Sequence, residues 1–172
     1  MASVYEKYYE RQPAAVKVIA VAGLALTGYL VYRAHKKKAD LSAANQAGQL
    51  ATNELSALAQ QGVYPSYSDS QFQVFVDTLV QAMTGCGTDE DAVYNVFRQM
   101  RNDADIRKLV AQFGVQFYQP CAWTSPISYS IWQFDDQHYG GGLATWLGYD
   151  LSSDNISEIN GILRDNGINY QF

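Results

Sequence analysis

The chain has 172 residues, 48% of them hydrophobic, a length and composition that suit one folded domain with an additional segment. Its net charge of −5 is uneven: residues 1–61 carry seven Lys/Arg and four Asp/Glu (+3), whereas residues 62–172 carry five and thirteen (−8). The acidic C-terminal part argues against nucleic-acid binding, because contacts with phosphates need clustered Lys and Arg.

The N-terminal part is dominated by an apolar run, since residues 14–32 contain a single charged side chain, Lys17. These residues come close to the roughly 20 that a helix needs to cross a bilayer. We therefore predict an N-terminal tail over residues 1–13 and a single transmembrane helix over residues 14–33. A buried helix of a soluble domain is disfavoured because the run has no polar face. A cleaved signal peptide is disfavoured because a basic cluster follows the run.

The residues that flank and interrupt this run indicate how it would lie in a bilayer. Interfacial aromatics are common at span boundaries, and Tyr29 and Tyr32 lie near the C-terminal one. The cations that follow are Arg33, Lys36, Lys37 and Lys38, which we expect to bind lipid headgroups. They outnumber the preceding cations by one, which favours a cytoplasmic C-terminal side. Gly23 and Gly28 would admit a neighbouring copy of the helix.

Residues 34–69 are predicted to form a basic juxtamembrane segment, a stalk and a linker. Residues 39–61 are rich in Ala and Gln, and their leucines are too sparse for a core face, which indicates a helical stalk that can continue the membrane helix. The following "GVYPSYSDS" reads as a linker that ends in a helix cap at Ser68 or Asp69.

Residues 70–172 show amphipathic patterns that predict five short helices. In the first helix, apolar residues recur at steps of 3, 1, 3, 1 and 3 from Phe72 to Met83. The apolar positions of the other four helices are Val93, Val96, Phe97 and Met100; Ile106, Leu109, Val110 and Phe113; Leu143, Trp146, Leu147 and Leu151; and Ile156, Ile159, Ile162 and Leu163.

Cap residues separate these predicted helices. Thr88 is expected to cap the second helix, with Asp91 three residues on. The third is expected to begin near Asn102 or Asp103 and to stop at Gly114. The last is expected to be capped by Ser152 or Ser153, and Gly167 to end it.

An aromatic insertion, residues 115–142, interrupts the helical pattern. It holds seven aromatic residues, two prolines and a glycine triplet, and it reads either as a long loop or as a β-hairpin, since "ISYSIWQF" alternates. The aromatics would form a lid on the core or an interface, because aromatics are enriched at interfaces. In the second case the expected partner contacts are Trp123, Trp132, Phe134 and Tyr139.

Three segments together resemble one annexin repeat: "AMTGCGTDEDAVYNVF", "RNDADIRKLVAQFG" and "LATWLGYDLSS", within residues 70–165. The resemblance implies an all-α fold and a calcium ion held by the carbonyl oxygens of Met83, Gly85 and Gly87 and by the carboxylate of Asp150. Calcium prefers such oxygen donors. The alternative is that the glycine loop is only a turn between helices. Annexins usually hold four repeats, whereas this chain has room for one and carries the insertion.

The module is also similar to annexin-like proteins of Bacteroidetes phages, which implies a minor virion membrane protein that links the membrane of a lipid-containing bacteriophage to its capsid. The expected location is then the virion or host inner membrane, with the C-terminal domain facing the cytoplasm or the capsid. One alternative is a calcium-dependent module that binds anionic lipid. Another is a cell-wall-associated lytic or accessory protein.

Residues suited to catalysis are few, and we predict that the chain is not an enzyme. The histidines are His35 and His138, and no Ser-His-Asp pattern or phosphate loop is apparent. "DDQH", which ends at His138, reads as a solvated loop rather than a metal site. Cys86 and Cys121 form no metal-type pair, and they favour a reducing compartment, with one disulfide bond as the alternative.

Overall fold

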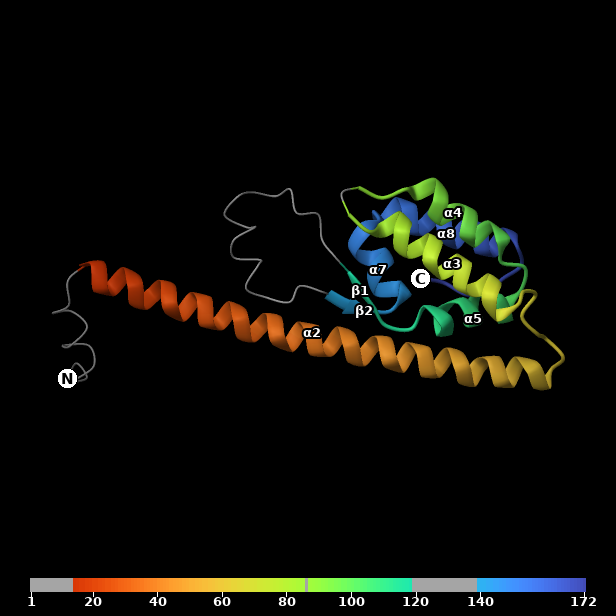
Figure 1. The fold of residues 1–172 in the computed structure, drawn as a ribbon, viewed down its shortest axis with the longest axis horizontal. Helices are drawn as coiled ribbons and strands as arrows, with labels where there is room; N and C mark the ends of the chain where they lie inside the picture. The colour runs from red at the N-terminus through yellow and green to blue at the C-terminus, as the bar shows by residue number, and fades with distance from the viewer. Residues whose placement is uncertain (1–13, 86, 119–138) are drawn as a thin grey trace. The chain divides into compact units, whose positions relative to one another are not determined.

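The computed structural model describes residues 14–85, 87–118 and 139–172, and side chains of the first helix are described from residue 28 onward, except at residues 30, 33 and 37. The described residues are mostly helical, which confirms the predicted all-α class (Figure 1). Their elements are α2 (Ala14–Gln60), α3 (Asp69–Met83), α4 (Glu90–Gln99), α5 (Asp103–Phe113), β1 (Gln116–Tyr118), β2 (Tyr139–Gly141), α7 (Leu143–Asp150) and α8 (Ser153–Asp165).

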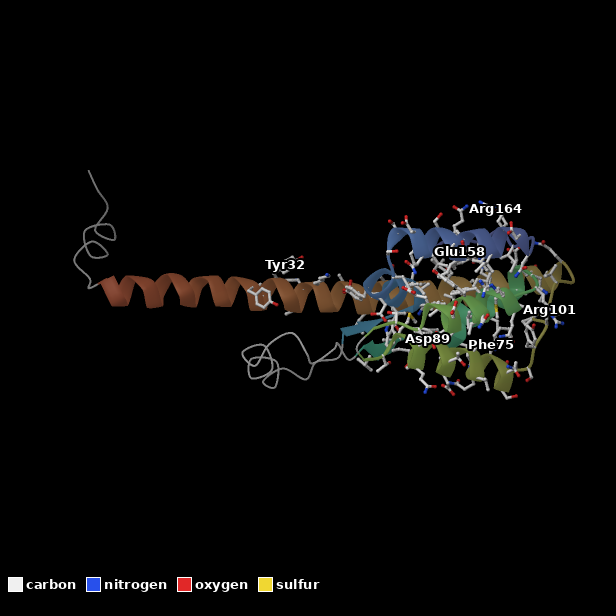
Figure 2. All side chains as sticks on the ribbon, turned by 90° about the horizontal axis from the view of Figure 1, so that it is seen from above. Tyr32, Phe75, Asp89, Arg101, Glu158 and Arg164 are labelled. Atoms are coloured by element: carbon white, nitrogen blue, oxygen red, sulfur yellow. The ribbon has the colours of Figure 1, made fainter. Side chains whose placement is uncertain are left out.

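The chain divides into two units, residues 1–38 and residues 39–172, and α2 crosses the boundary. In the first unit, Tyr29, Val31 and Tyr32 are exposed (Tyr32 in Figure 2). Within the described part of the chain, no helix is both long enough and apolar enough to cross a bilayer. Most side chains of the predicted span, residues 14–33, are not among the described ones, so the span stays a prediction.

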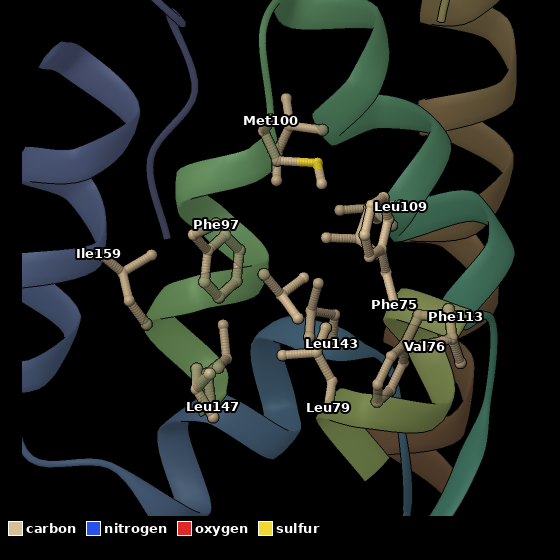
Figure 3. Packing of buried hydrophobic residues seen from close by; sticks show 14 of the residues in the cluster. Phe75, Val76, Leu79, Phe97, Met100, Leu109, Phe113, Leu143, Leu147 and Ile159 are labelled. Atoms are coloured by element: carbon tan, nitrogen blue, oxygen red, sulfur yellow. The ribbon is translucent and has the colours of Figure 1, made fainter. Parts of the chain in front are cut away.

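The second unit has a hydrophobic core to which α3, α4, α5, α7 and α8 all contribute. The predicted apolar face of α3 is confirmed, because Phe72, Phe75, Val76, Leu79 and Met83 are all buried. Figure 3 shows side chains of all five helices converging on this core. Burying a side chain of this size stabilises a fold by about 1.5–3 kcal/mol, so the five helices can hold one another together.

Most of the predicted helix ends are confirmed. The side chains of Ser68, Asn102 and Ser152 accept hydrogen bonds from backbone N–H groups in the first turns of α3, α5 and α8. Gly114 ends α5 with a φ of 55°. These side chains satisfy N–H groups that a helix leaves without intrahelical partners.

The predicted cap of α4 is wrong. Thr88 does not cap this helix; instead the side chain of Asp89 accepts the hydrogen bond of Ala92 N at 3.0 Å. The Thr88 hydroxyl donates to the backbone carbonyl of Asp150 at 3.4 Å. The Thr88 hydroxyl is therefore engaged in a long-range contact and does not cap α4. The N-cap is Asp89, one residue later than predicted.

Two short strands form the base of the aromatic insertion. β1 and β2 pair antiparallel, with Gln116 opposite Gly141 and Tyr118 opposite Tyr139. The indole Nε1–H of Trp146 donates to the carbonyl of Gln116 at 3.3 Å and ties this base to α7. The alternating "ISYSIWQF" lies outside the described residues.

Residues 39–60 are helical, as predicted for a stalk, and they pack on the rest of the second unit. Ala44 and Ala51 are 4% and 3% exposed, whereas Leu50 is 61% exposed. The fully buried positions are therefore alanines, and the leucines at 41, 55 and 58 are only half-buried, which explains why the spacing of the leucines did not predict a core face. A Cβ atom on Gly142 would lie 3.3 Å from the Cβ of Ala44, so the two backbones approach closely.

Candidate functional site

The turn between α3 and α4 is shaped by two glycines. Gly85 and Gly87 have φ values of 101° and 91°, a backbone region that L side chains rarely adopt. The loop is closed by the backbone N–H of Asp89, which donates to the carbonyl of Ala82 at 3.0 Å. Glycine is therefore required by this backbone conformation, whether or not the loop binds an ion.

Asp150 lies next to this loop, although it is 63 residues away from Gly87 in the chain. It is the last residue of α7, and its carbonyl accepts the hydrogen bond from Thr88. The Oδ2 atom of its carboxylate is shielded from solvent. The structure thus brings the predicted carboxylate beside the loop whose carbonyls complete the predicted set.

These residues fit a calcium ion in donor type. The side chain of Met83 is fully buried, so this residue could offer only its carbonyl oxygen. Apart from the chain neighbours, no heavy atom of the described residues lies within 4 Å of where a Cβ of Gly85 or Gly87 would stand, so one side of each backbone is open to them. Carbonyl and carboxylate oxygens are the ligands that calcium prefers. Within residues 14–85, 87–118 and 139–172, no group of three or more His, Cys, Asp or Glu could hold a metal.

The predicted headgroup-binding residues lie on α2. Lys36 and Lys38 are exposed, and the side chains of Arg33 and Lys37 lie outside the described ones. Positions 33, 36 and 37 recur at spacings of three and four, so they share a face of the helix. Of the two glycines predicted to admit a neighbouring copy, Gly28 is exposed, and Gly23 lies outside the described side chains.

Most of the predicted partner contacts fall outside the described residues, namely Trp123, Trp132 and Phe134. Tyr139 is the first residue of β2, and its side chain is also not described. The described aromatic of this region is Phe117 in β1, which is exposed.

The amino-acid pattern did not single out Asp105, the one buried charged residue in the described part of the chain. Its carboxylate accepts hydrogen bonds from Ser66 N at 2.6 Å and from Arg101 N at 2.9 Å. It thereby joins the linker before α3 to the turn between α4 and α5. One signal was available: an aspartate three residues after the cap Asn102.

A second unpredicted cluster joins α2, α5 and the C-terminal tail. The guanidinium of Arg107 lies 4.6 Å from the ring centroid of Tyr170, and its Nε pairs with the carboxylate of Glu54. Burial raises the pKa of the Tyr170 hydroxyl, the charge of Arg107 partly opposes this shift, and Glu54 adds to it. Beside the cluster lies an open depression of about 220 Å³, which Glu54, Asp103, Arg107 and Asn169 help to line.

Asp150 therefore lies beside the glycine loop, whereas the side chains of the predicted partner contacts lie outside the described residues. Comparisons with protein-family models, with curated proteins and with solved structures find no match for this chain.

Proposed function

We propose that this chain is a membrane-anchored interaction protein that holds an acidic helical domain near a bilayer and links it to a protein partner. The observation that carries the proposal is one unbroken helix, α2, in which the apolar run of residues 14–32 passes into the basic cluster of residues 33–38. An apolar run followed by cations is typical of a membrane span with its headgroup-binding end.

The charge of the folded part favours a protein partner over the lipid surface. Residues 62–172 carry a net charge of −8, and anionic headgroups would repel them unless a cation intervened. Glu158, on α8, is one of the exposed carboxylates of this part of the chain (labelled in Figure 2). A basic protein surface is the complement of such a domain. In a lipid-containing bacteriophage, the setting that the resemblance implies, this partner would be the capsid.

The proposal is tested by fractionating cells that express the full chain. We expect it in the membrane pellet after an alkaline wash and in solution only after detergent is added. Val21→Lys/Leu24→Lys should move it to the soluble fraction, because a charge at the centre of a span costs about 2.5–3.5 kcal/mol. Val74→Lys, on an exposed position of α3, is the matched control. Recovery of the unmodified chain as a monomer in plain buffer would contradict the anchor.

A second candidate, a calcium-dependent lipid-binding module, is favoured by the contact between Thr88 and Asp150 beside the glycine loop. A calcium ion would there neutralise the acidic surface and contact anionic headgroups. We expect weak binding, with a Kd of about 10⁻⁴–10⁻³ M, as for calcium modules of low affinity. Titration calorimetry on the full chain in detergent should show a heat of calcium binding. The variant Asp150→Asn should abolish this heat.

Asp154→Asn, an exposed position at the start of α8, is the control for simple loss of a negative charge. It should leave the calcium heat unchanged. If the unmodified chain gives no heat at millimolar calcium, the loop serves only as a turn between helices.

A further inference from the structure

The second half of α2, residues 39–60 (hereafter the strap), contributes little to the hydrophobic core. Among the described residues, Ala51 is the only member of α2 in the core cluster, which otherwise consists of residues from Phe72 onward. The body, residues 62–118 and 139–172, supplies the large buried side chains (Figure 3). Removal of the strap would therefore take one residue, Ala51, from the described core cluster.

The seam between the strap and the body is incompletely packed. The strap runs beside α5 (Figure 1), with residues 54–61 near the start of α5 and residues 44–53 near its end. A cavity of about 150 Å³ lies in the seam, lined by Ala43, Ala47, Val110 and Leu143 among others. An open groove of about 330 Å³ adjoins it. Protein interiors have few voids larger than a water molecule, so the cavity of about 150 Å³ makes this seam looser than a core contact.

Two polar contacts hold the strap at separate points. Near its start, the hydroxyl of Tyr149 donates to the carboxylate of Asp40 at 2.9 Å. Farther along, Glu54 pairs with Arg107, whose side chain is mostly buried. The strap partner is exposed in one contact, Glu54, and partly exposed in the other, Asp40, so water can replace both contacts at modest cost.

We propose that the strap is a releasable element, which docks on the body in one state and separates from it in another while the body stays folded. Release lengthens the connection between residue 38 and the body by up to about 33 Å, because an α-helix rises about 1.5 Å per residue. It also uncovers the face of α5 that carries Val110, and Gly114 directly after this helix. This inference does not depend on the proposed membrane anchor.

The test is to lock the strap with a disulfide bond and compare amide exchange in the two redox states. Ala44→Cys/Gly142→Cys is the pair chosen, because the Cβ positions lie 3.3 Å apart, so a small outward shift of the strap reaches the range of about 3.5–4.5 Å found in disulfide bonds. Gly142 has a φ of −80°, which any residue adopts. The background is the full chain in detergent with Cys86→Ser and Cys121→Ser.

Exchange is followed peptide by peptide with mass spectrometry. Oxidation should slow exchange in residues 45–60 by at least about tenfold relative to the reduced protein, because a released helix end frays. Exchange in α3 and α8 should be the same in both states. If the strap of the unmodified chain exchanges as slowly as α3, and oxidation changes nothing, the strap is a fixed part of the fold and the proposal fails.

A milder variant covers the case in which the double cysteine protein does not fold. Glu54→Gln removes the ion pair with Arg107, and it should accelerate exchange in the strap about two- to fivefold, as expected for the loss of a surface ion pair. Glu158→Gln, on the exposed face of α8, should leave strap exchange unchanged. Equal strap exchange in Glu54→Gln and in the unmodified chain would count against release.

Discussion

Among single residues, Asp105 has the most demanding surroundings, because its carboxylate is fully buried and no described cation pairs with it in an ion pair. Two backbone N–H groups, from Ser66 and Arg101, point at its oxygens instead. Hydrogen bonds to a charged acceptor are stronger than neutral ones, and they compensate the loss of hydration. One side chain therefore fixes two turns that lie far apart in the sequence.

We predict that Asp105→Ala lowers the free energy of unfolding by about 3 kcal/mol, since it removes the buried acceptor of two partly buried N–H groups. Urea denaturation followed by tryptophan fluorescence measures the change. Asp77→Ala is the control, because Asp77 is exposed and accepts one hydrogen bond, from Gln73. It should cost less than about 0.5 kcal/mol. Equal costs for the two variants would show that the carboxylate of Asp105 is not needed to hold the turns.

Tyr170 predicts how stability responds to alkaline pH. Burial raises the pKa of its hydroxyl above the ordinary value of about 10, so the unfolded chain loses this proton first as the pH rises. The contribution of Tyr170 to stability is then fully present below about pH 10 and is lost as the pH rises through the raised pKa.

Tyr170→Phe should therefore flatten the fall of the denaturation midpoint between roughly pH 9 and 12. Tyr64→Phe removes a hydroxyl from an exposed ring and serves as the control. If both variants show the alkaline slope of the unmodified chain, the hydroxyl of Tyr170 ionises alike in the folded and unfolded states.

Among the elements, α4 offers a direct test of which residue begins the helix. Asp89→Ala should destabilise the fold by about 1 kcal/mol, because it removes the hydrogen bond to Ala92 N, and the negative charge near the helix N-terminus. Thr88→Val should cost less, since the hydroxyl makes a long contact of 3.4 Å with the carbonyl of Asp150. Thermal unfolding of both variants measures the two losses of stability. A larger loss for Thr88→Val would show that Thr88 contributes more than Asp89 to the start of α4.

The helices were predictable from the sequence where the signal was local. The spacing of apolar residues in α3 and the caps Ser68, Asn102 and Ser152 depend on neighbours within one or two turns. The contacts of Asp105 and Thr88 were not predictable, because their partners lie 39 and 62 residues away.

The docking of the strap was missed for a different reason. Ala44 and Ala51 form its buried face, and alanine is common on exposed and buried helix faces alike. For the candidate site, the resemblance supplied the pairing of Asp150 with the glycine loop, which periodicity alone would not have given.

For the whole molecule, Trp146 connects elements that are separate in the chain. Its ring packs edge to face on Phe113 of α5, with centroids 5.6 Å apart, and its indole N–H reaches the carbonyl of Gln116. We predict that Trp146→Ala lowers the free energy of unfolding by about 3–5 kcal/mol, as for other large core truncations. Val74→Ala, at an exposed position, should stay within about 0.5 kcal/mol. Chemical denaturation compares them, and a loss below 1 kcal/mol for Trp146→Ala would contradict its role.

The paired strands β1 and β2 have a practical consequence for protein engineering. Their register places Tyr118 opposite Tyr139, so the residues before and after positions 119–138 are paired in one sheet. The entropy of closing a loop grows only slowly with its length, so a foreign peptide can replace this stretch at small cost. Such a graft would delete Trp123, Trp132 and Phe134 together, and a binding assay on it would separate recognition from folding.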